Sequence, residues 1–448
     1  MPDLFGRAAS LLLGDDLETA DSPDARLLLA QLGYAGVQFE GAKSRSQMRH
    51  RAALLKAASR FVRVFELAAP EAPGLVCFGA EFDPAVADPL HAGGPLAGVS
   101  GVGLSLQEAF QGCIGEGVEY LSQLQTGNDR IDPVGSGSPA AKLGPLGRDF
   151  VAAFSAHRLR PHAELSWHRA TRLIDGEQVW LPADLCLRRP PALQEIKPPF
   201  PLSAGSAAGT SWDSAALHGL LELIERDAAS LWWQGGKSGK SIPPGDEARI
   251  MSETLLAQLR QDTSVRRSWL LDITTDIGVP CVAAVSCAAD GFGLALGLAA
   301  RPTLTAAARS AILEMCQIEL AHAVVEAKCH ERGEAALNPR DLVHRRRATL
   351  IDADRCPLLQ PVAGRAEHLA IDSTDAKALL RGLVDRLGQF GIETFGLDLT
   401  RPCFAIPVAR VIAPGLQPEP SEIVMPRLAN MIARTGGGAT YTGGVALL

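Results

Sequence analysis

One helical pattern occurs three times in this chain, in residues 105–119, 211–225 and 303–317. Each copy opens with a hydroxyl residue, and the following face carries an alanine, a small residue, a glutamate, and then a glutamate or glutamine. These positions share one face at about 100° per residue, and the opening hydroxyl can cap the helix. Because each copy follows a small-residue turn or strand-like sequence, the chain is predicted to be an α/β protein with internally pseudo-repeated strand-strand-helix units. The wide spacing of the copies argues against a solenoid.

The acidic residues are the chemically informative part of this pattern. Two copies carry a Glu-x-x-Glu pair, whose members lie side by side on a helix and repel each other. Such helices are common on solvated surfaces, but leucine and isoleucine surround the acids of the second copy. Burying an uncompensated charge is costly, so divalent cations and a phosphate substrate are one explanation. Gln317 could equally be a satisfied core polar group. The candidate residues are Glu116, Glu119, Glu222, Glu225, Glu314 and Gln317.

Composition narrows the class of protein. Of 448 residues, 47% are hydrophobic and 21% are charged, which is typical of a globular chain. The net charge is −7 and no basic run is longer than residues 344–347, which argues against a nucleic-acid surface. The start of the chain lacks a basic signal-peptide region, and no apolar run is long enough to span a membrane. Nine scattered cysteines without a Cys-x-x-Cys pair indicate reduced thiols, a cytoplasmic protein and no zinc site.

Local patterns predict the order of the elements. Residues 1–58 have a helical pattern, and an amphipathic helix is expected at 375–390. Residues 126–149 and 331–365 are interpreted as long loops, and the tail from residue 414 has little pattern. Strands are expected at residues 61–67, 74–82, 164–172, 177–182, 268–274, 279–286, 293–299, 393–399 and 406–412.

Several other segments are similar to known phosphate- or metal-binding motifs but lack residues that those motifs need. Residues 234–241 end in Gly-Lys-Ser, but they lack the first glycine of a P-loop and follow a helix, so they are interpreted as a mobile loop. A single Glu-x-x-His, formed by Glu319 and His322, does not make a di-iron site, which needs two. His218 could share a helix face with Glu222, although a lone histidine there is more often structural.

Residues 220–227, which read Leu-Leu-Glu-Leu-Ile-Glu-Arg-Asp, closely resemble the YcaO family when taken with the small-residue loop at 203–209. Residues 115–119 and 311–321 resemble the family's first and third glutamate motifs, and residues 398–400 and 406–416 resemble its C-terminal strands. The resemblance implies a YcaO-like fold with internal pseudo-symmetry. It also implies an N-terminal helical segment (1–58), an ATP-binding catalytic domain (59–416) and a C-terminal tail (417–448).

The activity implied by the resemblance is ATP- and Mg²⁺-dependent activation of backbone amides in a ribosomally made precursor peptide. Cys, Ser or Thr side chains would then form thiazoline or oxazoline rings, as in bacteriocin maturation. Arg226 would hold phosphate, since its planar fork matches phosphate oxygens, and Asp227 is either a ligand or an ion-pair partner. The resemblance implies magnesium and ATP ligands at Glu116, Glu119, Glu222 and Glu225, catalytic roles for Glu222, Glu225 and Arg226, and a nucleotide pocket lined by Glu314 and Gln317.

The sequence also departs from the family pattern, and alternatives stay open. The departures are Tyr120, Ala204, Thr210, Ser310 and a C-terminus without Pro-x-Pro-x-Pro. A thioamide- or amidine-forming enzyme and a catalytically degenerate scaffold subunit are therefore the rival hypotheses. Residues 1–58 contain no obvious leader-binding module, so family analogy implies a separate leader-peptide-binding protein. A flavin dehydrogenase and a homodimer within a complex are further expected partners, whereas nucleic acid and membrane are not.

Overall fold

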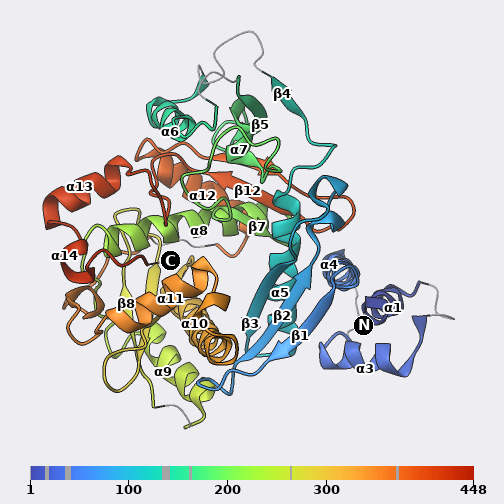
Figure 1. Ribbon diagram of the computed structural model, residues 1–448, viewed down its shortest axis with the longest axis horizontal. Coiled ribbons are helices and arrows are strands. Elements are labelled where there is room, and N and C mark those ends of the chain that lie inside the picture. The colour runs from blue at the N-terminus through green and yellow to red at the C-terminus, as the bar shows by residue number, and fades with distance from the viewer. Residues whose placement is uncertain are drawn as a thin grey trace.

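The N-terminal segment of the computed structural model is helical, as expected. The structure describes residues 2–15, 20–35, 42–133, 142–160, 164–262, 265–369 and 373–447. Helices α1 (Pro2–Leu13), α3 (Pro23–Gln31) and α4 (Ala42–Ala58) lie together at one side of the molecule, next to the first sheet (Figure 1). Helix α1 packs on α3 and α4, and α4 packs on α5 (Leu106–Gln123), so this segment covers the outer side of α5.

The first sheet is antiparallel and has the order β1-β2-β3. Its strands are β1 (Arg63–Leu67), β2 (Val76–Phe82) and β3 (Ala97–Gly103), and α5 packs on β2 and β3. The predicted strands at 61–67 and 74–82 are confirmed, but β3 was not predicted, because only its last three residues were interpreted, as a turn. Its glycines have a packing role, since a Cβ on Gly101 would overlap the backbone nitrogen of Cys113 in α5. The low strand propensity of this sequence is thus offset by a close helix contact.

The second sheet repeats this arrangement with the order β10-β9-β8. Its strands are β8 (Arg267–Asp272), β9 (Cys281–Cys287) and β10 (Ala295–Ala300), and they confirm the strands expected at 268–299. Every residue of β9 and β10 is buried. Helix α10 (Leu304–Arg332) packs on β10 and β9, and α9 (Glu247–Arg260) packs on α10.

The third sheet joins segments that lie far apart in the sequence. Its order is β4-β5-β11-β12-β7, and β6 pairs with the other side of β5. Helix α8 (Trp212–Trp233) packs on β12 and β7 and crosses the centre of the molecule, with the second sheet below it (Figure 1). Helix α12 (Ala376–Gly388) packs against α8. The strands are β4 (Ile131–Pro133), β5 (Ser166–Arg172), β6 (Gln178–Pro182), β7 (Ser206–Ala208), β11 (Phe395–Asp398) and β12 (Val408–Ile412).

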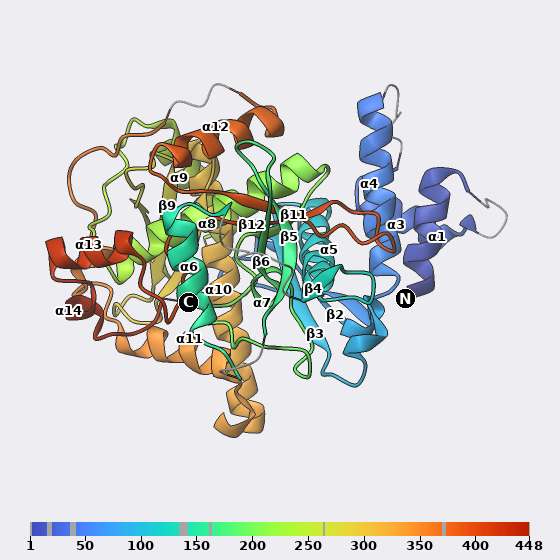
Figure 2. The same cartoon turned by 90° about the horizontal axis from the view of Figure 1, so that it is seen from above.

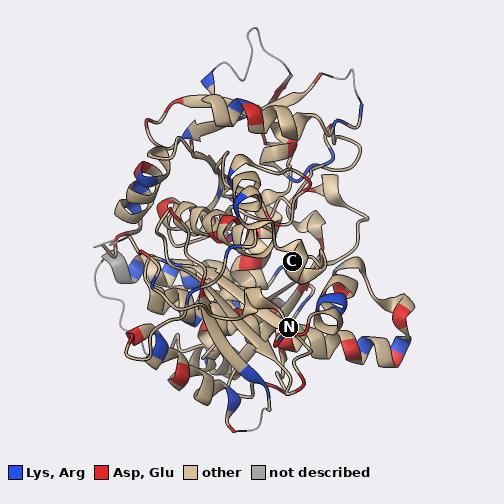
Figure 3. Cartoon of the chain, turned by 90° about the vertical axis from the view of Figure 1, so that its left-hand side faces the viewer, with Lys and Arg blue, Asp and Glu red and all other residues tan. Residues whose placement is uncertain are grey.

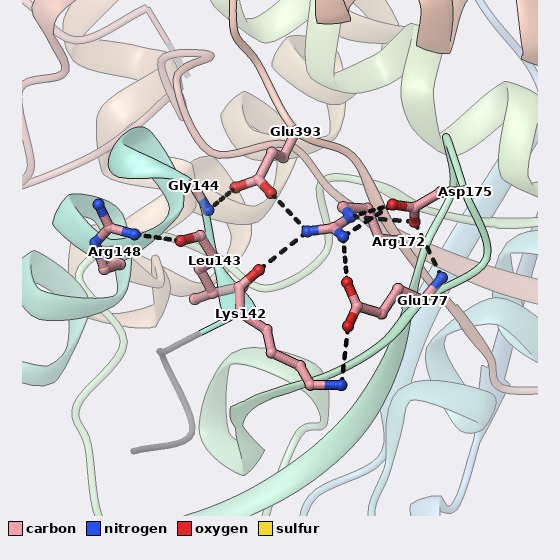
Figure 4. Close-up of polar contacts among 8 residues, drawn as sticks. All are labelled: Lys142, Leu143, Gly144, Arg148, Arg172, Asp175, Glu177 and Glu393. Atoms are coloured by element: carbon pink, nitrogen blue, oxygen red, sulfur yellow. Dashed lines mark hydrogen bonds and ion pairs between the residues drawn. The ribbon is translucent and has the colours of Figure 1, made fainter. Parts of the chain in front are cut away.

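A polar network anchors one end of this sheet (Figure 4). The Arg172 guanidinium donates to Asp175 and Glu177 in the turn between β5 and β6, and to the Glu393 carboxylate with an Nη1–Oε1 distance of 3.3 Å. Glu393 also accepts a hydrogen bond of 2.7 Å from the backbone nitrogen of Gly144, directly before α6 (Pro145–Ser155). The network therefore joins a hairpin, the residues before β11 and the start of a helix.

Three segments differ from their expected structure. The loop expected at 331–365 contains α11 (Pro339–Leu350), which has a capping box between Asn338 and Asp341. The loop expected at 126–149 contains β4 and the start of α6, and its residues 134–141 lie outside the described part. The patternless tail contains α13 (Pro426–Thr435) and α14 (Ala439–Thr442). Tertiary contacts outweigh weak local signals in these segments.

The loop at 234–241 is held in place rather than mobile. The backbone nitrogen of Lys240 donates to the Asp272 carbonyl at 2.8 Å, and the nitrogen of Ser241 donates to the Val362 carbonyl at 3.0 Å. These bonds extend the second sheet at β8, so the Gly-Lys-Ser sequence serves a structural purpose there. The three-part division of the chain and the pseudo-repeat remain predictions.

Charges and cysteines follow the expected distribution. Acidic and basic residues are interspersed over the side of the molecule seen in Figure 3. All nine cysteines are free thiols, and seven of them are buried. Within the described ranges, no helix combines the length and the apolar character that crossing a bilayer requires.

Candidate active site

Three helices that carry the candidate acids start in the same way. In α5, α8 and α10 the side chain of the N-cap residue accepts a hydrogen bond from the backbone nitrogen three residues later, at 3.1–3.2 Å. These caps are Ser105, Ser211 and Thr303, and they confirm the capping role expected of the opening hydroxyl. Because the caps set the start of each helix, the acids emerge at equivalent turns.

Glycines bring each helix unusually close to its sheet. A Cβ on Gly101 of β3 would overlap Cys113, and a Cβ on Gly297 of β10 would overlap the Ala311 carbonyl. In α8, a Cβ on Gly219 would overlap the carbonyl of Gly205, in the loop before β7. The small residue at the ninth position of each copy therefore faces a glycine, as close helix approach requires. One turn later, the carboxylates are within reach of backbone N–H groups at the strand ends.

Two acids of α8 bind backbone donors from different layers. Glu222 Oε2 accepts from the nitrogen of Gly205 at 3.1 Å, and Glu225 Oε2 accepts from the nitrogen of Ala300 at 3.3 Å. On α10, Glu314 Oε2 accepts from the nitrogen of Leu298 at 2.9 Å. Helix α8 contacts β10, the strand on which α10 packs, and Figure 2 shows the molecule from above, with α1, α3 and α4 at one side of this central region. Two helices thus direct carboxylates toward the end of β10.

Arg226 is the cation among these carboxylates. Its Nη2 lies 3.4 Å from Glu222 Oε1 and 3.8 Å from Glu225 Oε1. Burial lowers the pKa of Arg226, but the carboxylates of Glu225, Glu222 and Glu314 outweigh burial and raise it. Burial raises the pKa of Glu225 to about 8 and also raises the pKa of Glu314, while Arg226 opposes both shifts. The attraction of Arg226 therefore does not cancel the effect of burial on these two carboxylates.

The acids of α5 approach the same region. Burial raises the pKa of Glu119 well above its usual value, and repulsion from Glu222 and Glu116 adds to the shift. Arg188 and Arg410 oppose it. Glu119 is half-buried, whereas Glu116 is exposed at the edge of the site. The structure therefore brings Glu119 of α5 within electrostatic reach of Glu222 of α8, although the two residues are far apart in the sequence.

Gln317, Asp227 and His218 have other partners. Gln317 Nε2 donates to Ser100 Oγ of β3 at 2.8 Å, as a satisfied polar group would. Asp227 is fully buried, pairs with Arg427 at 2.9 Å and accepts from the backbone nitrogen of Gln417 at 3.0 Å, so it is an ion-pair partner. His218 is exposed.

Sequence reasoning missed three arginines that face the acids. Arg410 of β12 is 2% exposed, donates to the Leu185 carbonyl at 3.0 Å, and has a pKa that burial lowers to about 10. Arg188 lies directly after the short helix α7 (Ala183–Cys186) and Leu187, and Arg301 follows β10. Arg301 lowers the pKa of Glu225 and Glu314. Arg410 lies within the strand expected at 406–412, and Arg301 lies two residues after the strand expected at 293–299. No periodic signal relates these two arginines or Arg188 to the acids.

The donor set suits magnesium bound together with a phosphate ligand. Within the described ranges, no three His, Cys, Asp or Glu side chains form a ready-made metal cluster. Magnesium usually takes only one or two carboxylates together with phosphate oxygens and water, so a three-carboxylate cluster is not required. Burial raises the pKa values of Glu119, Glu225 and Glu314, and repulsion from neighbouring carboxylates adds a smaller contribution. A divalent cation at this site would oppose both effects.

Comparisons with known proteins concern the family and the fold of this chain. The family model described as YcaO cyclodehydratase, ATP- and Mg²⁺-binding, matches residues 100–417. An uncharacterized protein in the tfuA 3′ region of Rhizobium leguminosarum bv. trifolii is 28% identical over an alignment of 295 residues. The match covers 56% of this chain and 61% of that protein. The chain thus spans less than two thirds of that relative.

Two solved structures share the fold. A heterocyclase in complex with substrate and cofactor has a TM-score of 0.66 at 21% identity, covering 92% of this chain and 59% of that one. YcaO from Methanopyrus kandleri bound with AMPPCP and Mg²⁺ has a TM-score of 0.55 at 20% identity, covering 84% of this chain and 91% of that one. At these identities the likeness concerns the α/β fold.

Proposed function

Because this chain belongs to the YcaO cyclodehydratase family, we propose that it uses ATP and Mg²⁺ to activate backbone amides of a ribosomally made precursor peptide. The products are thiazoline or oxazoline rings formed from Cys, Ser or Thr. The observation that carries the proposal is the convergence of Glu222 and Glu225 from α8 and Glu314 from α10 around Arg226, with Glu119 of α5 within electrostatic reach of Glu222.

Each residue has a role that its surroundings support. Glu119, Glu222 and Glu225 hold magnesium, and Glu116 at the exposed edge completes the set. Magnesium, when bound, neutralises charge on the triphosphate. Arg226 is fixed between Glu222 and Glu225, and it binds a phosphate oxygen with its planar fork. Glu314 and Gln317 line the nucleotide pocket. This division fits phosphoryl transfer, which depends on positioning and charge stabilisation more than on a protein nucleophile.

Ring formation is a dehydration, so it needs no external oxidant. The Cys, Ser or Thr side chain attacks the preceding carbonyl carbon, and its proton is lost to solvent or a nearby base. The former carbonyl oxygen takes the γ-phosphoryl group of ATP, which leaves ADP. The C–O bond then breaks to release phosphate, and the amide nitrogen loses its proton as the C=N bond of the ring forms. The net change in the peptide is the loss of one water per ring. Oxidation to an azole is a separate step, for which a flavin dehydrogenase is the proposed partner.

The same proposal implies a partner protein and a cellular compartment. A separate protein recruits the precursor peptide through its leader, and the enzyme acts in the cytoplasm, where ATP is available. The free cysteines are consistent with a reducing compartment.

Glu222→Gln provides the direct test. It keeps the size of the side chain but removes the charge, so peptide-dependent ATP hydrolysis should fall about 100-fold or more, with unfolding temperature little changed. Glu253→Gln is the matched control, because Glu253 is an exposed α9 glutamate that pairs with Arg249 at 2.6 Å. Intact mass of the product peptide identifies the ring by loss of water, whereas exchange of oxygen for sulfur would identify a thioamide instead. Undiminished turnover in Glu222→Gln would remove the metal-ligand role.

A further inference from the structure

A cavity lies beside the C-terminal half of α5, close to Glu119. It has a volume of about 370 Å³ and lies between the C-terminal half of α5 and residues 188–202. Tyr120 and Leu124 of α5 form one wall. Tyr120 directly follows Glu119, and Leu202 leads into the loop that holds Glu222 through Gly205. Arg188, which also lines the cavity, lies within electrostatic reach of Glu119. The cavity therefore adjoins the proposed reaction site, and its volume is in the range of small binding sites, which start at about 300 Å³.

Prolines and aromatic residues form the apolar part of the cavity wall. Four prolines line the cavity, together with Phe200 and Tyr120. Proline has a fixed φ and no N–H group, so this wall keeps its shape but offers few backbone donors. Such a wall suits an apolar side chain better than a phosphate, because phosphate sites are rich in backbone N–H groups. The prolines are Pro190, Pro191, Pro198 and Pro201.

One charged group in the cavity is available for a ligand. Arg189 is neutralised by Asp184 at 3.4 Å and Glu195 at 3.1 Å, and His91 Nε2 is bound to the Gln125 carbonyl. Arg188, in contrast, has no carboxylate within ion-pair distance in the described part of the chain. Its Nε donates to Gln123 Oε1 at 2.7 Å, and its guanidinium lies 4.8 Å from the centre of the Tyr120 ring. Its terminal amino groups thus remain free to donate at the cavity wall next to Glu119.

We propose that this cavity binds the substrate peptide, taking the side chain of the residue before the reacting Cys, Ser or Thr. An apolar or aromatic side chain fills the space between Tyr120, Phe200 and the prolines. Arg188 donates to a backbone carbonyl of the same segment, which places the amide to be activated beside Glu119. Arg188 is a positioning residue in this arrangement. The inference rests on the proposed function, since it requires a peptide substrate at the carboxylates.

The test uses the full chain and synthetic probes. Three fluorescein-labelled peptides have the same glycine-rich sequence and one cysteine, and they differ only in carrying Phe, Ala or Asp before that cysteine. Binding is measured by fluorescence anisotropy with AMPPCP and Mg²⁺ present. The Phe peptide should bind about tenfold more tightly than the Ala peptide, because it buries an aromatic side chain, and the Asp peptide should not exceed the Ala peptide.

Variants separate this proposal from a nucleotide role. Arg188→Ala should weaken binding of the Phe peptide about tenfold and leave AMPPCP binding within about twofold. Arg169→Ala is the matched control, since Arg169 also lies over an aromatic ring, 5.0 Å from the centre of Trp180, outside the cavity lining. Arg188→Gln, which keeps a donor for Gln123, serves if the alanine variant does not fold.

Three results would overturn the cavity assignment. They are equal binding of the three peptides, equal effects of the Arg188 and Arg169 variants, and loss of AMPPCP binding in the Arg188 variant, which would make this a nucleotide site. Absent peptide binding in a protein that still binds AMPPCP also refutes the cavity while leaving the ATP chemistry in place. Failure of the unmodified protein to bind AMPPCP would instead refute the proposed function.

Discussion

Arg226 shows how much a single side chain organises in this protein. Its guanidinium contacts Glu222 and Glu225 on its own helix and opposes the rise that burial causes in the pKa of Glu314 on another. Identity and spacing selected the three glutamates from the sequence, whereas Arg226 was selected by the resemblance to the family. The contribution of Arg188, Arg301 and Arg410 was not predicted, because their proximity to the acids is set by the fold.

His322 of α10 gives a pH-dependent prediction at the same scale. Its Nε2 atom is buried without a hydrogen-bond partner among the described residues. Burial lowers the pKa of His322, Arg347, His344 and Arg266 add to the shift, and together these effects bring the pKa to about 3. The unfolded chain takes up a proton on this histidine near its ordinary pKa of about 6.5, while the folded chain does not. Stability is therefore unaffected above that pH and is lost as the pH falls below it.

The expected size is about 2 kcal/mol of unfolding free energy between about pH 7.5 and about pH 5. Denaturant unfolding at several pH values measures it. His322→Gln should remove this part of the pH dependence, whereas His330→Gln, an exposed position on the same helix, should leave it unchanged. An unaltered pH profile in His322→Gln would show that this histidine titrates equally in both states.

At the scale of elements, the three acid-bearing helices depend on close contact with their sheets. These helices, their caps and most strands were predicted because each has a local signal, such as a hydroxyl cap or an alternating run. Strand β3 lacked one, since it is rich in glycine. Helix α13 was missed although Pro426 begins it and Gly436 ends it. Their positions follow from packing on α5 and α8.

Gly297→Ala tests the contact between β10 and α10. The new Cβ would overlap the backbone at Ala311 and Met315, which cannot move without separating helix and sheet. The free energy of unfolding should fall by about 3 kcal/mol, the upper part of the range for overpacking. Gly382→Ala in α12 is the control, because its Cβ meets no atom within 4 Å, and it should raise stability by about 0.5–1 kcal/mol. Chemical denaturation measures the free energy of unfolding of both variants. Unchanged stability in Gly297→Ala would rule out the close approach of α10 to β10.

At the scale of the whole molecule, the C-terminal residues hold the central helix in place. Gln417 and Arg427 both bind the buried Asp227 of α8. Further along, the Trp233 indole donates to the Val445 carbonyl at 2.7 Å. These contacts join residues about two hundred positions apart, so the segment that showed little pattern supports the helix that carries Glu222 and Glu225.

Arg427→Leu should therefore destabilise the protein by about 3–5 kcal/mol, since it leaves a buried carboxylate without its partner. Adding Asp227→Asn removes the charge and should restore part of the loss. A double-mutant cycle on unfolding free energies measures the coupling. Additive effects of the two substitutions would mean that this ion pair does not hold the C-terminal segment on α8.

The sequence by itself determined the three acid-bearing helices, their caps and the placement of their acids on one helix face. It also determined the resemblance to a family, because all of these features depend on residues within a few turns of one another. Only the tertiary structure decided which acids meet, which arginines face them and where a cavity opens beside them. That information lies in pairings such as β12 with β7, between residues 408–410 and 206–208. Local periodicity cannot specify such pairings, because their energy comes from burial shared between segments that are distant in the chain.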